Sequence, residues 1–300
     1  MSYVGRFAPS PTGPLHIGSL ATAVASFLHA RQASGSWLVR IEDIDPPREM
    51  PGAADEILRT LEACDLDWDG AVVFQSTRRA LYDSACSRLL NAGVAFRCSC
   101  TRSALRADDG AIGPYPGTCR ETTRHDRQTA VRVRVEPGTE RFVDGVQGPI
   151  ETRLCETTGD YVIWRRDGLP AYHLAVVADD AEQRVTTVVR GVDLLDSTAV
   201  HLHLQRALGL PSPAYFHVPV VVNADGQKLS KQTGAPPIDR SEPHRAAATV
   251  LEILGARIPA ELLGARPREL WGWAATNWRI DGLRGRRELT SPTVASLERG

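Results

Sequence analysis

The chain has 300 residues, enough for one large domain or two ordinary ones. Its formal net charge is −1, so no overall basic field points to nucleic acid, although a local arginine-rich face would suffice to bind one. No apolar run reaches the roughly 20 residues of a membrane span, and no signal-peptide pattern is present, so we expect a cytoplasmic protein. In that compartment the six cysteines are better interpreted as thiols or metal ligands than as disulfides.

The first segments predict a strand, a turn and a helix. A short apolar start, Tyr3-Val4, is followed by a Pro/Gly-rich stretch from Arg6 to Ser19 and by an alanine-rich apolar stretch over residues 20–33. In an open α/β sheet, such a turn directs the free N–H groups of the helix N-terminus at the ligand crevice, where anions bind. Neither a Walker A loop nor a dinucleotide fingerprint is present. His16 and Ser19 can donate hydrogen bonds here, although a histidine in this place is more often a cap or a packing residue.

Strand and helix patterns then alternate along the chain. Strands are predicted over residues 37–41, 72–74, 131–135 and 185–189, and helices over residues 52–64, 78–91 and 197–208. The segment 131–135 alternates strictly and should be a half-exposed strand. An apolar run over residues 216–222 leads into a loop that contains the lysines. Strand–helix units with right-handed crossovers build a mostly parallel sheet, so the predicted fold class is α/β.

Only two lysines occur in the chain, and they lie three residues apart in Lys228-Leu229-Ser230-Lys231. All other basic side chains, histidine aside, are arginines. A compact, mobile ammonium suits a point contact with phosphate, which a planar guanidinium fork does not replace. We therefore predict that this loop binds a polyphosphate. Chance placement of two lysines in a Gly-rich loop is the alternative.

Three cysteines, Cys98, Cys100 and Cys119, lie in a Gly/Pro-rich segment with little apolar content. Such a segment buries too little surface to hold its shape, and a structural zinc would supply the missing free energy. Three thiolates and one further ligand, for which His125 is an ordinary choice, make a closed tetrahedral site. Reduced, unligated thiols are the alternative. The other cysteines have apolar or helical neighbours and are interpreted as core or surface thiols: Cys64, Cys86 and Cys155.

Two of these segments together resemble a known family. His16-Ile17-Gly18-Ser19 is similar to the HIGH signature of class I aminoacyl-tRNA synthetases, and Lys228-Leu229-Ser230-Lys231-Gln232 is similar to their KMSKS signature. The context from Arg6 to Ser19, with Arg40-Ile41-Glu42-Asp43-Ile44-Asp45 downstream, resembles the glutamyl branch. The last His of HIGH is Ser19 here and the Met of KMSKS is Leu229, so a second catalytic histidine has no counterpart.

The resemblance extends from end to end to the shortened, queuosine-directed group within the glutamyl branch. Only about seventy residues follow the lysine loop, too few for the large helical anticodon-binding region of full-length relatives. The resemblance implies ATP-dependent activation of L-glutamate, with Mg²⁺ accompanying ATP, and transfer of glutamate to the queuosine base in the anticodon of tRNA(Asp). It also implies that Tyr115, in the pattern C-x-C…Y-x-x-x-C, is the fourth zinc ligand. We expect a monomer.

The expected domain organisation follows the same resemblance. A Rossmann-like class I catalytic core is expected in two halves, with a zinc-binding, acceptor-like insertion between them and a short helical C-terminal part. The boundaries are 1–97 for the first half, 98–127 for the insertion, 128–240 for the second half with the lysine loop, and 241–300 for the C-terminal part. No anticodon-binding domain is expected.

The resemblance also assigns site residues. The catalytic positions are His16, Lys228 and Lys231. The ATP-binding positions are His16, Gly18, Ser19, Lys228, Ser230 and Lys231. The glutamate-binding positions are Arg6, Phe7, Ala8, Pro9, Ser10, Glu42, Tyr172 and Arg190. By residue type, Arg6 and Arg190 can each take a carboxylate bidentately, and Glu42 can take the ammonium. Structural ion pairs, or a core aromatic at Tyr172, are the alternatives.

Two rival functions are compatible with the same sequence. One is a short glutamyl-tRNA synthetase that charges a tRNA 3′ end. The other is a catalytically silent binding module derived from a synthetase, against which the intact lysine loop and helix-start chemistry argue.

Overall fold

The computed structural model describes residues 2–101, 103–105, 113–122, 124, 126–223, 225–229 and 235–290. None of the helices in these ranges is long and apolar enough to cross a membrane.

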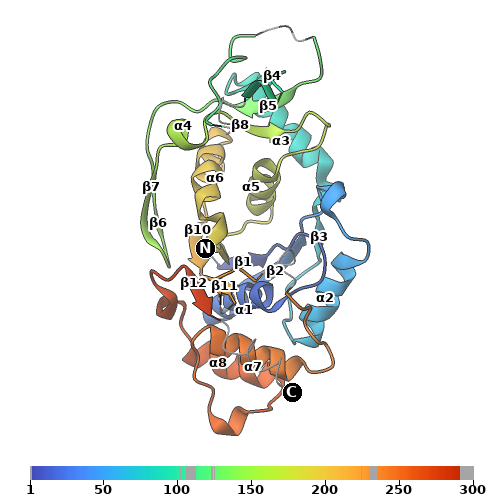
Figure 1. Ribbon diagram of the computed structural model, residues 1–300, viewed down its shortest axis with the longest axis vertical. Coiled ribbons are helices and arrows are strands. Elements are labelled where there is room, and N and C mark those ends of the chain that lie inside the picture. Colours follow the sequence, from blue (N-terminus) through green and yellow to red (C-terminus); the bar gives the residue numbers. More distant parts are fainter. Residues whose placement is uncertain are drawn as a thin grey trace.

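A parallel sheet lies at the centre of the molecule (Figure 1). β1 (Val4–Phe7) pairs in parallel with β2 (Ser36–Ile41), which pairs in parallel with β3 (Val73–Phe74). On the other side of β1 lie β9 (Thr187–Gly191) and β10 (Ala214–Val218), which also pair in parallel. The Thr186 N–H joins the two groups by donating to the Val4 carbonyl at 2.9 Å. The predicted parallel α/β core is confirmed.

Helix α1 (Ile17–Gln32) packs between this sheet and the C-terminal helices α7 (Pro243–Ile253) and α8 (Pro267–Asn277). Because protein covers it on both sides, nearly every residue in its middle is buried, which explains its apolar, alanine-rich composition. The helix begins three residues before the predicted start. The apolar run alone predicts a start at residue 20, whereas a cap formed by His16 and Ser19 starts the helix at Ile17.

A second core lies beyond the parallel sheet. Helices α3 (Arg79–Asn91), α5 (Tyr172–Glu182) and α6 (Leu195–Ala207) pack there against an antiparallel sheet. This sheet has the order β4 (Ala95–Cys98), β5 (Ala130–Val133) and β8 (Tyr161–Trp164). The predicted half-exposed strand at residues 131–135 is β5, in which buried and part-exposed residues alternate. The strands β4 and β8 and the helix α5 were not predicted.

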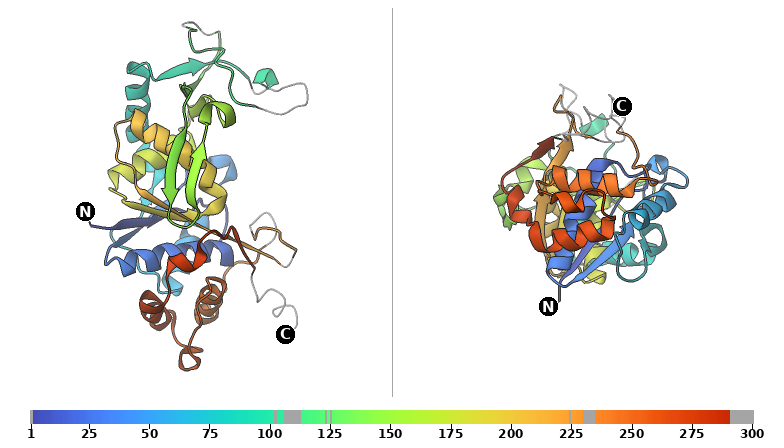
Figure 2. Two further views of the ribbon diagram at one scale, coloured as in Figure 1. Left: turned by 90° about the vertical axis from the view of Figure 1, so that its left-hand side faces the viewer. Right: turned by 90° about the horizontal axis from the view of Figure 1, so that it is seen from below.

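The remaining elements connect these cores. Antiparallel strands β6 (Glu140–Asp144) and β7 (Gly148–Thr152) form a long hairpin along one side, which Figure 2 shows in green. Helix α2 (Ala53–Ala63) follows the predicted range closely, and α4 (Leu154–Thr157) is a single turn.

The segment before the lysine loop is broken into two strands. Pro219 separates β10 from β11 (Val220–Val222), which pairs in parallel with β12 (Glu288–Thr290) from the far end of the chain. Proline lacks the N–H that a continuous ladder would need.

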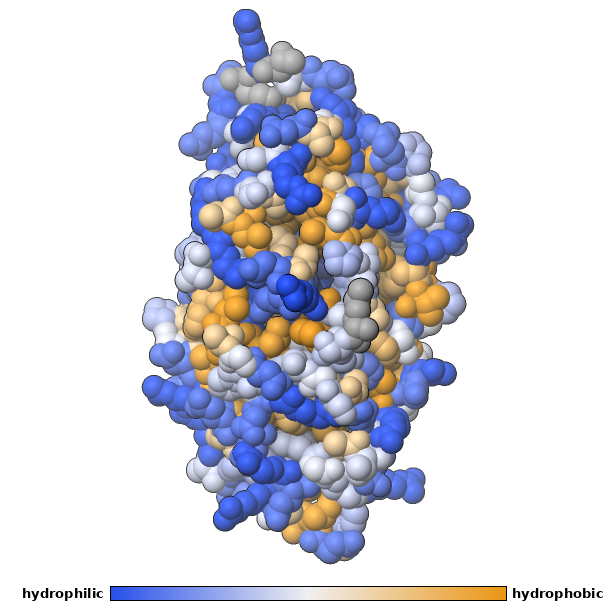
Figure 3. Space-filling view, turned by 180° about the vertical axis from the view of Figure 1, so that it is seen from behind, coloured by the Kyte–Doolittle hydropathy of each residue, from blue (hydrophilic) through white to orange (hydrophobic). Residues whose placement is uncertain are grey.

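The surface is mostly hydrophilic. On the face opposite to that of Figure 1, hydrophobic side chains show mainly around the middle of the molecule, between two hydrophilic ends (Figure 3).

Candidate active site

Two adjoining cavities lie where β1, β2 and β9 end. The larger has a volume of about 550 Å³ and the smaller about 360 Å³. They share six lining residues: Phe7, Ser10, Thr22, Glu42, Arg48 and Gly191. Because the carboxyl ends of neighbouring parallel strands meet at one edge of a sheet, this is where an α/β protein places its ligand.

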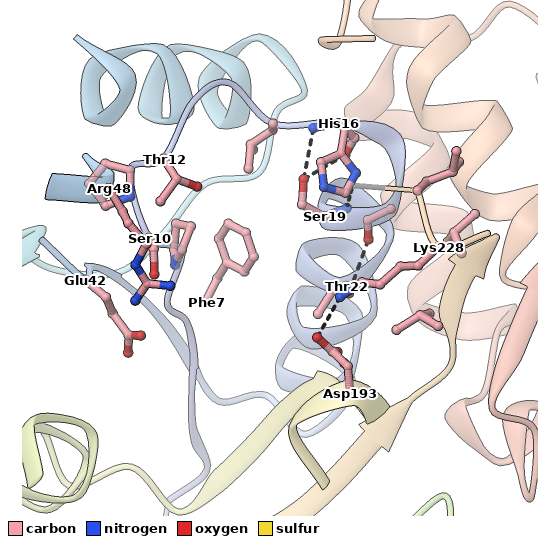
Figure 4. A pocket seen from close by; sticks show the side chains of 18 of the residues that line it. Phe7, Ser10, Thr12, His16, Ser19, Thr22, Glu42, Arg48, Asp193 and Lys228 are labelled. Atoms are coloured by element: carbon pink, nitrogen blue, oxygen red, sulfur yellow. Dashed lines mark hydrogen bonds and ion pairs between the residues drawn. The ribbon is translucent and has the colours of Figure 1, made fainter. Parts of the chain in front are cut away.

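The larger cavity brings together the helix start and the lysine loop. His16, Gly18 and Ser19 line it, and Lys228 reaches it from the segment after β11 (Figure 4). The Lys228 Nζ donates to Asp193 Oδ2 at 2.7 Å. Asp193 was not singled out from the sequence, where an isolated aspartate gives no signal. The other two predicted loop positions, Ser230 and Lys231, lie outside the described residues.

His16 is both the cap of α1 and a wall of the cavity. Its Nδ1 accepts a hydrogen bond from the Ser19 N–H at 3.3 Å, while Ser19 Oγ accepts one from the His16 N–H at 3.0 Å. Since Nδ1 is the acceptor, a neutral imidazole carries its proton on Nε2. Gly18 leaves room for this ring, because a Cβ at that position would stand 3.2 Å from two atoms of it.

The predicted glutamate-binding residues lie together around the smaller cavity. They come from β1 and its turn, from the residue after β2, from the start of α5 and from β9. The cavity is lined by Arg6, Phe7, Ala8, Ser10, Glu42, Tyr172 and Arg190. Pro9, the remaining predicted member, lines the larger cavity.

A buried ion-pair network supports one side of this cavity. Asp180 of α5 accepts from Arg6 Nε at 3.2 Å and from Arg40 Nη1 at 2.8 Å. Arg40 also pairs with Glu42 at 3.2 Å. Burial alone would raise the pKa of Asp180, but Arg6 and Arg40 outweigh it and hold that pKa below its usual value. For Glu42 burial prevails over the pull of Arg40, and its pKa is raised.

Arg190 is held in a different way. Its guanidinium is buried, with hydrogen bonds from Nε to His217, from Nη2 to Thr198 and from Nη1 to the Tyr172 hydroxyl, at 3.0, 2.8 and 3.4 Å. Nη2 also donates to the Leu194 carbonyl at 3.1 Å, and Nη1 lies 3.3 Å from His201 Nδ1. All these partners are uncharged, and within the described part of the chain no carboxylate forms an ion pair with Arg190. Among the described residues, its positive charge therefore has no carboxylate in direct contact beside the cavity.

The imidazoles around Arg190 are neutral. Burial lowers the pKa of His173 to about 4, and the positive charge of Arg190 acts in the same direction. The pKa of His201 also lies well below its usual value. Burial is the larger cause, and the positive charge of Arg190 is the next. For His217 burial again lowers the pKa, although its hydrogen bond to Asp144 opposes the shift. At neutral pH these rings therefore add no charge of their own.

The three predicted zinc-ligand thiols form a cluster. The sulfurs of Cys98, Cys100 and Cys119 all lie within 4.8 Å of one another. The Tyr115 hydroxyl is 3.4 Å from the Cys98 sulfur and 3.6 Å from the Cys100 sulfur. This donor set fits a tetrahedral metal site. His125 lies outside the described residues, so the structure does not compare it with Tyr115.

Residues 3–242 match the family described as tRNA synthetases class I (E and Q), catalytic domain. A protein from Ectopseudomonas mendocina named Glutamyl-Q tRNA(Asp) synthetase is 50% identical over 289 residues, covering 96% of this chain and 97% of the relative. A protein of the same name from Pseudomonas aeruginosa is 49% identical, and the match covers 97% of this chain and 98% of the relative. Another from Aromatoleum aromaticum is 52% identical, and the match covers 98% of this chain and 94% of the relative. The chain belongs to the glutamyl-Q tRNA(Asp) synthetase family. The predicted resemblance is confirmed.

Solved structures agree on the fold. A glutamate-tRNA synthetase from Elizabethkingia anophelis superposes with a TM-score of 0.83 at 24% identity, covering 98% of this chain and 69% of that one. A glutamate tRNA ligase from Elizabethkingia meningosepticum, in complex with its amino acid, superposes with a TM-score of 0.82 at 24% identity. The match covers 97% of this chain and 68% of that one. The class I synthetase catalytic fold expected from the sequence is confirmed.

Proposed function

We propose that the chain activates L-glutamate with ATP and transfers the glutamyl group to the queuosine base in the anticodon of tRNA(Asp). The observation that carries the proposal is the match along nearly the whole chain to relatives that bear this name. The paired cavities support it, because one is lined by the residues suited to phosphate and the other by those suited to glutamate.

In the activation step, an oxygen of the glutamate α-carboxylate attacks the α-phosphorus of ATP. A carboxylate–phosphorus bond forms, the bond to the bridging oxygen breaks, and pyrophosphate leaves with the electron pair. Such a step needs alignment and charge neutralisation more than a protein nucleophile. In the second step, a nucleophilic group of the queuosine base attacks the glutamyl carbonyl, and AMP leaves.

The larger cavity would hold ATP. The Nε2–H of His16 and the N–H groups at the start of α1 supply donors for phosphate oxygens. Lys228 supplies a positive charge, and we propose Lys231 and Ser230 as further members of the same loop. Mg²⁺ would enter with the nucleotide, and the protein's part is then to hold the phosphates in line.

The smaller cavity would hold glutamate. Arg190 is the strongest candidate for a substrate carboxylate, because its guanidinium is buried with uncharged partners only. An arriving carboxylate would supply a countercharge in direct contact with the guanidinium. Glu42, which pairs with Arg40 and whose pKa is raised by burial, would gain a second countercharge from the substrate ammonium. Arg6, Tyr172 and the turn after β1 would orient the rest of the molecule.

We propose that Cys98, Cys100, Cys119 and Tyr115 hold one structural zinc ion. Three sulfurs and a phenolic oxygen at short mutual distances match the ligand number of a closed zinc site, which stabilises a segment with little core of its own. We further propose that the protein is a monomer that acts in the cytoplasm.

The test uses labelled glutamate, ATP and Mg²⁺ with tRNA(Asp) that carries or lacks queuosine, beside tRNA(Glu). We expect label only on queuosine-containing tRNA(Asp). This label should remain on the tRNA after its 3′ end has been removed. Label on tRNA(Glu) would make the protein a short charging enzyme. Absence of both label and ATP–pyrophosphate exchange would leave a silent binding module.

A further inference from the structure

The orientation of Arg190 depends on two side chains that come from distant parts of the chain. His217, on β10, accepts the Arg190 Nε–H on its Nε2 at 3.0 Å. The other ring nitrogen of His217, Nδ1, lies 2.6 Å from Asp144 Oδ2 at the tip of the β6–β7 hairpin. His217 and Asp144 have no exposed side-chain surface. A buried chain of hydrogen bonds therefore runs from the hairpin tip to the wall of the smaller cavity.

The two oxygens of Asp144 have separate tasks. Oδ1 accepts the backbone N–H groups of Val146, Gln147 and His217 at 3.0, 2.8 and 3.0 Å, which closes the hairpin turn and ties it to β10. Among the described residues, the hydrogen bond of Oδ2 is to the His217 ring. A substitution that changes only Oδ2 can therefore change the hydrogen bond to His217 while Oδ1 keeps its hydrogen bonds to the backbone of the turn.

The hydrogen-bond chain admits one tautomer of His217. An arginine Nε always carries its proton, so the facing Nε2 of the histidine must be the acceptor. The ring proton then lies on Nδ1 and points at Asp144. The Thr198 hydroxyl agrees with this assignment, because it accepts from Arg190 Nη2 and lies 3.1 Å from His217 Nε2, to which it can donate.

We propose that Asp144 and His217 are positioning residues, which hold Arg190 in the orientation in which it binds a substrate carboxylate. The inference rests on the proposed role of Arg190 in glutamate binding. The arrangement has a specific advantage. A carboxylate in direct contact would orient the guanidinium but also neutralise it, whereas a neutral imidazole placed between them orients Arg190 and leaves its charge for the substrate.

The sharpest test is Asp144→Asn. An asparagine can keep its Oδ1 on the three backbone N–H groups, but its Nδ2 then donates to His217 Nδ1. The ring proton must move to Nε2, where it faces the Arg190 Nε–H, and two donors oppose each other. Substitution of an aspartate by asparagine elsewhere imposes a wrong histidine tautomer in the same manner. We expect the KM for glutamate in ATP–pyrophosphate exchange to rise roughly 10- to 100-fold, as for loss of a hydrogen bond to a charged group. The KM for ATP should stay nearly constant.

A second substitution separates positioning from general damage. A glutamine at position 217 offers a carbonyl oxygen near the place of Nε2, whatever residue 144 is, so His217→Gln in the Asp144→Asn background should recover most of the lost glutamate affinity. His217→Leu, which offers no acceptor, should recover none. The matched control is Glu140→Gln, which removes a carboxylate from the same strand, where it pairs with Arg206 outside both cavities. It should leave both KM values unchanged.

Nitrogen NMR of histidine-labelled protein gives a readout that needs no activity. We expect His217 to be protonated on Nδ1 in the natural protein and on Nε2 in Asp144→Asn. An unchanged glutamate KM in Asp144→Asn, or an equal rise for glutamate and ATP without recovery by glutamine, would overturn the proposal. If the natural protein shows no glutamate-dependent exchange, the proposed function fails instead, and an unchanged His217 tautomer in the variant would then overturn the positioning chain itself.

Discussion

The buried arginines around the smaller cavity differ in how their charge is balanced. Arg6 and Arg40 share the carboxylate of Asp180, and Arg40 also pairs with Glu42 and Asp179, so both arginines have carboxylate partners before any ligand arrives. Arg190 has hydrogen bonds to uncharged groups only within the described residues. A buried charge that no carboxylate contacts directly is costly for the folded state. Such a cost is characteristic of a functional site, where a ligand supplies the missing partner.

At the residue scale, Asp180→Asn tests the compensated pair. Removal of one partner from a buried ion network leaves an unpaired charge, so we expect the free energy of unfolding to fall by about 3–5 kcal/mol. Because Arg6 loses its anchor, the KM for glutamate should rise as well. Denaturant titration and exchange kinetics measure the two effects.

The control for this change is Asp83→Asn. Asp83 pairs with Arg79 on the surface of α3, and both side chains are about half exposed. Such a pair contributes at most about 0.5 kcal/mol. An equal loss of unfolding free energy in the two variants would contradict the central role given to Asp180.

At the element scale, the start of α1 combines a helix cap with a ligand wall. Gly18 lies inside the first turn, where a glycine costs roughly 0.5–1 kcal/mol relative to alanine. A Cβ there would lie 3.2 Å from the His16 ring. The glycine therefore makes the helix less stable but leaves that ring in place.

Gly18→Ala should therefore separate stability from activity. We expect a thermal midpoint equal to or above that of the natural protein, together with a lower rate of ATP–pyrophosphate exchange because His16 is displaced. Gly272→Ala is the matched control, since Gly272 lies inside α8 with no atom within 4 Å of an added Cβ. It should raise the midpoint and leave exchange unchanged. If Gly18→Ala keeps the natural rate of ATP–pyrophosphate exchange, this glycine is not needed to place His16.

The elements that could be predicted from sequence are those with regular apolar patterns. Helix α2 and strand β2 lie almost where the pattern placed them. Strand β4 was missed because it is only four residues long, follows its turn closely and carries an exposed arginine. Helix α5 was missed because two acids interrupt its apolar run, and these acids turn out to be buried.

The site was predictable where it follows a local motif, and not where it depends on distant contacts. The turn after β1 and the cysteine cluster could be found because their residues are close in sequence and distinctive in type. Asp180 meets Arg6 across 174 positions, and Asp144 meets His217 across 73. Nothing local distinguishes these aspartates from surface ones, because only the folded sheet brings them beside the arginine and histidine.

At the scale of the whole molecule, the metal site should affect one region more than the rest. Cys119→Ser should release the proposed zinc and loosen the segment that follows β4, while ATP–pyrophosphate exchange persists because both cavities lie elsewhere. Metal content by mass spectrometry and limited proteolysis check this. Cys155→Ser, outside the cluster, should keep its metal. Full metal content in Cys119→Ser would contradict the ligand set.

The buried histidines make the stability of the whole chain depend on pH. In the unfolded chain His173 titrates near 6.5, whereas in the folded protein burial lowers its pKa to about 4. Between these values the unfolded state binds more protons, so the free energy of unfolding falls as the pH falls. For His173 the loss at pH 5 is about 2 kcal/mol relative to pH 7. Denaturant titrations at both values, on the natural protein and on His173→Gln, measure it. An equal fall in both proteins would exclude His173 as a source.

The pairing of β11 with β12 has a consequence for the nascent chain. The ribosome completes β11 at Val222 but reaches the start of its partner strand only at Glu288. At about 5–20 residues per second, this leaves an interval of roughly 3–13 s in which β11, next to the lysine loop, lacks its neighbour. The strands that line the smaller cavity are already made by then. During synthesis, therefore, all residues that line the smaller cavity are present while β11, which contributes Val220 and Val221 to the larger cavity, still lacks its pairing partner.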